Sequence, residues 1–134
     1  MTDKHLSSQF DADLNLLSSK VLEMGGLVEA QIVAAMNALN NFDLEIAEQV
    51  IAAEDRLNGM EVEIDEECSN IIARRQPAAR DLRLLLAISK TITNLERAGD
   101  EAEKIAKRTK RLMEDGASRT INIAEIKLSG EMAV

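Results

Sequence analysis

Oxygen-bearing side chains recur at helical spacing in two separate segments of this chain. Glu54, Asn58 and Glu61 follow one another at intervals of four and three residues, and Glu96 and Asp100 are four residues apart. On an α-helix these intervals place the side chains on one face. Carboxylate and amide oxygens suit Mg²⁺, Ca²⁺, Mn²⁺ or iron. We therefore expect a divalent or trivalent cation site, with Mg, Mn or Fe as candidate ions, where the two segments meet.

A second interpretation keeps these acids free of metal. Arg56, Arg97 or Lys104 would form ion pairs with them at the rim of a helical bundle. Carboxylate-bridged di-metal bundle proteins also add histidine to their ligands, whereas the single histidine of this chain is His5, close to the N-terminus. The residues by themselves leave both the metal site and the ion-paired surface open.

The overall composition narrows the class of protein. The net charge of −8 disfavours a nucleic-acid partner, because such binding needs cations that neutralise phosphates. Cys68 is the single cysteine, so no disulfide framework is possible and a reducing compartment is favoured. No apolar run approaches the roughly 20 residues that span a bilayer. We expect a cytoplasmic protein that is not embedded in a membrane and does not bind nucleic acid.

Three long helices are expected to carry the acids, over residues 7–40, 43–75 and 77–114. Asp43 is a suitable N-cap for the second helix, and Gln76-Pro77 should separate it from the third. Asp115-Gly116 is expected to stop the third helix. We then expect a linker over residues 117–121 and a fourth helix that starts at Asn122.

The predicted fold is all-α, a long antiparallel three-helix bundle over residues 1–115, followed over 116–134 by a linker and the start of a further helix. Short connections make neighbouring helices antiparallel. Phe10 and Phe42 are the sole aromatic residues, so aliphatic side chains must fill the core. Apolar residues in the last segment lack a mate in such a bundle, and exposed apolar surface usually marks an interface. A homodimer or other homo-oligomer is expected.

The turn near Pro77 predicts which acids meet. By a rotation of about 100° per residue, one line on the second helix holds Ala47, Val50, Glu54, Asn58, Glu61, Asp65, Cys68 and Ile72. With a pivot at residue 77, residue n lies level with about residue 154 − n of the third helix. Glu96 then faces Asn58, and Asp100 faces Glu54. Glu61 lies one turn away, so all five side chains should converge.

Several stretches together resemble the PhoU family. They are residues 24–29 (MGGLVE), 64–68 (IDEEC), 74–77 (RRQP), 81–84 (DLRL) and 95–100 (LERAGD), within a match over roughly 5–115. The resemblance implies two similar three-helix bundles, of which this chain would be the N-terminal half. It also implies an acidic motif, Glu or Asp followed by Asp four residues later, that binds metal clusters in some members. The motif corresponds here to Glu54 with Asn58 and to Glu96 with Asp100, and Asn58 departs from its acidic form.

The resemblance also implies a function that is not enzymatic. Family members act as negative regulators of phosphate uptake and phosphate-starvation signalling. The implied partners are the ATPase of the phosphate ABC transporter and a membrane sensor histidine kinase. Two alternatives stay open from the residues, namely a carboxylate-bridged metal-binding protein or metalloenzyme, and a purely structural dimerisation bundle.

Overall fold

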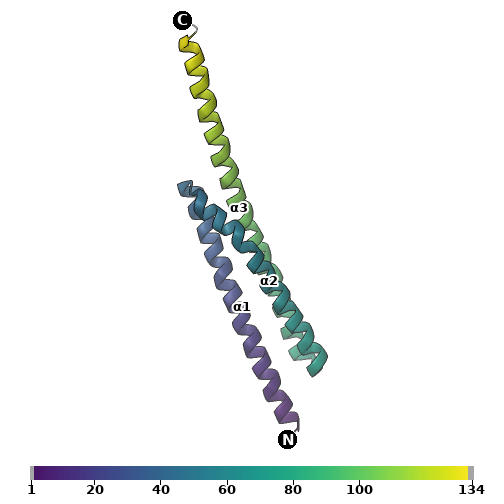
Figure 1. The fold of residues 1–134 in the computed structure, drawn as a ribbon. Helices are drawn as coiled ribbons and strands as arrows, with labels where there is room; N and C mark the ends of the chain where they lie inside the picture. Colours follow the sequence, from purple (N-terminus) through teal and green to yellow (C-terminus); the bar gives the residue numbers. More distant parts are fainter. Residues whose placement is uncertain (1, 133–134) are drawn as a thin grey trace.

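The chain folds into three helices in a computed structural model, which describes the backbone of residues 2–132 and the side chains of residues 8–116. Helix α1 spans Thr2–Asn41, α2 spans Leu44–Arg75 and α3 spans Ala79–Met132. Each helix contacts both of the others. Figure 1 shows α1 and α2 as an antiparallel pair, with α3 running back alongside them. The predicted all-α class is confirmed, and the described residues contain no strand.

The two turns form where the sequence predicts them. Asp43 caps α2, because its Oδ1 accepts the backbone N–H of Ile46 at 3.1 Å. At the other end Gln76 takes a left-handed conformation with φ 44°, and its N–H donates to the Ile72 carbonyl at 3.1 Å. That bond satisfies a carbonyl at the end of α2, and Pro77 then separates α2 from α3.

The predicted end of the third helix is wrong. Helix α3 continues through Asp115 and Gly116 to Met132, and extends beyond the turn between α1 and α2 (Figure 1). A glycine ends a helix when it adopts a left-handed conformation, and none of the described glycines has a positive φ. The expected linker and fourth helix are therefore one continuation of α3 as far as Met132. The expected apolar interface of that segment lies outside the described side chains.

The core follows a repeat of 3.5 residues, not 3.6. On α2 the buried residues are Ala47, Val50, Glu54, Leu57, Ile64, Cys68 and Ile71. Their alternating three- and four-residue spacing is that of a coiled-coil seam. The expected line through Asn58, Asp65 and Ile72 drifts off this seam. Asn58 and Asp65 are exposed, while Leu57 and Ile64 occupy the core.

Two core clusters fill the bundle. Large side chains, including Leu17, Met24 and Ile92, form the cluster near the turn between α2 and α3. Small side chains dominate the cluster near the turn between α1 and α2, where Ala35, Ala38, Ala47, Ala102 and Ala106 pack with Val50. The acids of interest lie at the boundary between the two clusters.

Candidate metal centre

Three carboxylates meet between α2 and α3. Glu54 comes from α2, and Glu96 and Asp100 come from adjacent turns of α3. One oxygen from each side chain lies within 4.8 Å of the oxygens from the other two. Among the described residues no other trio of potential metal-binding side chains lies this close. We refer to Glu54, Glu96 and Asp100 as the carboxylate site.

The register of the two helices brings these residues together as predicted. Ser89 Oγ donates to Asp65 Oδ1 at 3.0 Å, and Cys68 Sγ lies 4.0 Å from the Leu85 carbonyl oxygen. Both contacts join residues at almost the expected register across the turn. Because the register is set by these contacts, Asp100 lies level with Glu54 as expected.

Gly99 provides the space for Glu54. A Cβ atom at Gly99 would lie 3.1 Å from Leu57 Cδ1 and 3.4 Å from Glu54 Oε2. Glycine therefore allows both side chains to pack directly against the backbone of α3. The sequence analysis did not assign this role to Gly99. The sequence does contain a sign of this role, because Gly99 falls on the buried 3.5-residue repeat of α3, level with the buried acid Glu54 of α2.

Glu54 is a buried carboxyl with little compensation. Its side chain is buried at 4% exposure, and its Oε1 has no hydrogen-bond partner among the described residues. Burial raises the pKa of Glu54 from 4.5 to about 8, with further contributions from Asp100 and from the charges of Glu103 and Glu96. In the absence of a cation, this carboxyl is therefore largely protonated at neutral pH.

The neighbouring acids are perturbed in the same direction. Burial, followed by the charge of Asp100, raises the pKa of Glu96. Burial, followed by the charges of Asp65 and Asp100, raises the pKa of Glu61. Each shift means that the ionised form is destabilised by its surroundings. A cation that neutralises several carboxylates at once would reverse this destabilisation.

These residues fit a hard cation. Three carboxylates can offer up to six oxygens, and Oε1 of Glu54 accepts no hydrogen bond from any described residue. A bound ion would replace the shared protons of the site and join α2 to α3 by charge.

The other two expected ligands, Glu61 and Asn58, lie outside the carboxylate site. Glu61 is half-buried, close enough for its pKa to respond to Asp100, but it is not one of the three clustered residues. Asn58 is exposed, since the α2 seam passes through Leu57 instead. The set of five ligands thus stays a prediction. The structure brings three of the five close together, namely Glu54, Glu96 and Asp100.

The ion-pair interpretation is wrong for two of its three cations. Arg56 pairs with Glu23 at 3.7 Å, and Lys104 pairs with Glu101 at 3.2 Å, both away from the carboxylate site. Arg97 does lower the pKa of Glu96 through its charge. That effect is the smallest of those acting on Glu96, so Arg97 offsets only a small part of the negative charge at the site.

Comparisons with known proteins agree with the resemblance seen in the sequence. A family model described as "PhoU domain" matches residues 21–109. A "Phosphate-specific transport system accessory protein PhoU homolog" of Burkholderia sp is 58% identical over 135 residues, which cover 100% of this chain and 57% of that protein. The "Phosphate-specific transport system accessory protein PhoU" of Escherichia coli (strain K12) is 50% identical over 105 residues, or 78% of this chain and 44% of that protein.

A solved structure shares the fold. The crystal structure of PhoU from Pseudomonas aeruginosa superposes with a TM-score of 0.78 at 53% identity, covering 80% of this chain and 51% of that one. This chain spans about half the length of the relatives that it matches. Within the described residues, none of the helices is long and apolar enough to cross a bilayer. By its sequence matches and its fold, the chain belongs to the PhoU family.

Proposed function

We propose that this chain acts as an accessory protein of a phosphate-specific transport system. It would repress phosphate uptake and phosphate-starvation signalling when phosphate is plentiful. The observation that carries this proposal is its 58% identity, over the whole chain, to a relative whose name states that accessory role. The proposed mode of action is binding, without catalysis, to the transporter ATPase and to the cytoplasmic part of a sensor histidine kinase.

The proposed role includes a bound cation. Glu54, Glu96 and Asp100 would hold it, with Glu61 one turn away and Asn58 as an outer oxygen donor. The support is the burial of Glu54, its unpartnered Oε1 and the raised pKa values around it. A divalent or trivalent ion supplies positive charge at the boundary between the two core clusters. It would thereby fix the spacing of α2 and α3.

The location and the assembly are also proposals. A cytoplasmic location follows from the proposed partners, which would offer their cytoplasmic surfaces. Self-association would use the apolar residues of the last segment, whose side chains lie outside the described part of the chain. They are Ile121, Ile123, Ile126, Leu128 and Val134.

A reporter experiment tests the regulatory role. The chain is expressed in a bacterium that lacks its own PhoU-family gene and carries a reporter of phosphate starvation. We expect the reporter to be repressed in high phosphate, and expect Asp100→Asn to weaken that repression. The Glu101→Gln variant is a matched control, because Glu101 is exposed and pairs with Lys104 outside the carboxylate site. An unrepressed reporter, despite folded protein at normal abundance, would contradict the proposal.

A further inference from the structure

A groove runs along the outside of the bundle between α1 and α2. It consists of two hollows. The first has a volume of about 440 Å³ and is lined by Lys20, Glu23, Arg56, Gly59, Met60, Glu63 and Ile64. The second, of about 90 Å³, adjoins Leu27, Ala30, Ala53 and Leu57. Arg56 lines both hollows, and we name the two together the α1–α2 groove.

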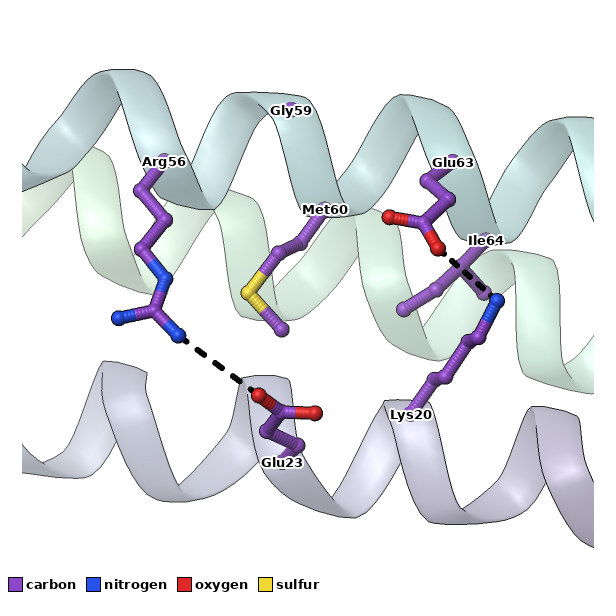
Figure 2. A pocket seen from close by; sticks show the side chains of 7 residues that line it. All are labelled: Lys20, Glu23, Arg56, Gly59, Met60, Glu63 and Ile64. Atoms are coloured by element: carbon purple, nitrogen blue, oxygen red, sulfur yellow. Dashed lines mark hydrogen bonds and ion pairs between the residues drawn. The ribbon is translucent and has the colours of Figure 1, made fainter.

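Two ion pairs cross this groove over an apolar floor. Figure 2 shows Met60 pointing from α2 towards α1, with one pair on either side of it. Lys20 Nζ lies 2.9 Å from Glu63 Oε1, while Arg56 Nη2 lies 3.7 Å from Glu23 Oε1. The Arg56 pair is long and mostly exposed, and pairs of that kind contribute little stability. Arg56 can therefore move aside at little cost and join the two hollows.

Small residues leave the groove open. Gly59, Ala30 and Ala53 line it where long side chains would fill it. A Cβ at Gly59 would meet no atom within 4 Å, so packing inside the chain does not require a glycine there. Glycine inside a helix is unfavourable relative to alanine. What Gly59 does permit is the close approach of another backbone.

The charge around the groove selects the partner. Between Lys20 and Ala73 the sequence has twelve acidic residues and two cations, Lys20 and Arg56, both of which line the groove. This segment holds the second half of α1 and nearly all of α2. A second copy of the chain would bring the same acidic surface and be repelled. A basic partner would instead gain attraction along the whole groove.

We propose that the α1–α2 groove binds an amphipathic, basic helix of a protein partner. Short apolar side chains of that helix lie on Met60 and Leu27, and its backbone passes close to Gly59. Its Lys or Arg residues replace Arg56 and Lys20 at Glu23 and Glu63. The groove spans residues 53–64 of α2, or roughly 16 Å, which accommodates about three helical turns. The inference rests on the proposed adaptor role and names its surface.

The probe is a displayed library of helical peptides. Each peptide has about 18 residues, long enough for the groove and one turn on each side. Its apolar positions are fixed as Leu or Ala at helical spacing, and its polar positions vary between Lys and Glu. The immobilised target is the full 134-residue chain. We expect selection to enrich Lys strongly over Glu, and expect the enriched peptides to lose affinity as salt is raised.

Matched variants locate the binding surface. Ala53→Gln fills the groove from α2, whereas Ala52→Gln places the same side chain at an exposed neighbouring position outside both hollows. Ala30→Gln fills the groove from an exposed position of α1, so it tests the proposal even where Ala53→Gln perturbs the fold. We expect at least about a tenfold loss of peptide affinity for both groove variants and no loss for Ala52→Gln.

Several results would overturn the inference. They are an absence of enriched peptides, enrichment of Glu, or equal binding by the groove variants and the wild type. A change in oligomeric state with Ala30→Gln, measured by sedimentation, would assign the groove to self-association instead. The peptide experiment has no phosphate-dependent readout, so its failure leaves the reporter result untouched. Conversely, failure of the reporter experiment leaves peptide binding untouched.

Discussion

Helix α2 carries two glutamates in opposite circumstances. Glu54 is buried against α3, faces the acids Glu96 and Asp100, and has an oxygen with no hydrogen-bond partner among residues 8–116. Glu63 lies further along the same helix, is mostly exposed, and pairs with Lys20 of α1 at 2.9 Å. The first side chain needs a proton or a cation from outside the chain, whereas the second is compensated within it. Helix α2 thus contributes to two different features. One is a site where ionised carboxylates destabilise the folded protein, and the other is a groove whose ion pairs can be replaced by those of a partner.

The largest expected effect concerns the protonation of Glu54 in metal-free protein. Its pKa is about 8 in the folded state and 4.5 for an ordinary carboxyl, so the folded protein binds the proton more tightly. Stability contributed by that proton is present below about pH 4.5 and is lost as the pH rises towards 8. At about 1.4 kcal/mol per pKa unit, the loss amounts to roughly 3–5 kcal/mol.

Urea unfolding in chelator, at several pH values from 5 to 8, measures this loss. We expect Glu54→Gln to be close to wild type at pH 5 and more stable than wild type at pH 8. Glu63→Gln is the matched control on the same helix, and should be slightly less stable than wild type because it weakens the pair with Lys20. A wild-type free energy of unfolding that rises from pH 5 to pH 8 would reject this account of Glu54.

The next effect is the response to metal. An ion that binds only the folded state at a hundredfold excess over its Kd stabilises the protein by about 2.7 kcal/mol. Melting curves with chelator and with Mg²⁺, Mn²⁺ or Fe³⁺ should show this rise for the wild type and for Glu101→Gln. Asp100→Asn should abolish it, and should be more stable than wild type in chelator because like charges are removed. If Asp100→Asn is less stable in chelator and neither form responds to any ion, the site does not bind metal.

Most of the bundle, and the meeting of its acids, was predictable from the sequence. Asp43 and Gln76-Pro77 mark the turns, and the pivot near Pro77 correctly placed Asp100 level with Glu54. The turn fixes that register because both helices rise equally per residue. The sequence alone therefore suffices to predict that Glu54, Glu96 and Asp100 lie together.

The predictions that were wrong or missing have local causes. A straight-helix rotation placed Asn58 on the core line, but supercoiling tightens the repeat to 3.5 residues and puts Leu57 there. The expected stop at Gly116 failed because a glycine ends a helix only when it leaves helical dihedrals. The role of Gly99 could not be predicted from the sequence alone, because it depends on how closely the backbones of α2 and α3 approach each other.

Replacing either of two glycines with alanine should have a smaller effect on stability, and the two variants serve as a matched pair. A Cβ at Gly59 meets nothing within 4 Å, so Gly59→Ala should increase the free energy of unfolding by about 1 kcal/mol through helix propensity. A Cβ at Gly99 would lie 3.1 Å from the buried Leu57, so Gly99→Ala should lose that gain to crowding. Chemical denaturation of both variants measures the difference. Gly99→Ala should also reduce the metal-dependent rise in melting temperature, and Gly59→Ala should not. Equal stabilisation by both would mean that Gly99 does not hold the two helices close.

The smallest expected effect is the coupling between Lys20 and Glu63. The hydrogen bond from Lys20 to Glu63 raises the pKa of the lysine, so the pair stabilises the folded state at neutral pH and ceases to do so when the lysine deprotonates above its ordinary value of 10.5. Because Glu63 is exposed, a double-mutant cycle of Lys20→Ala and Glu63→Ala should give only about 0.2–1 kcal/mol. The coupling should shrink further at about 1 M salt, where the screening length is near 3 Å. A coupling well above this range, unchanged by salt, would mean that the pair is too strong to exchange with a basic partner helix, and that the charges of the groove are as fixed as those of the carboxylate site.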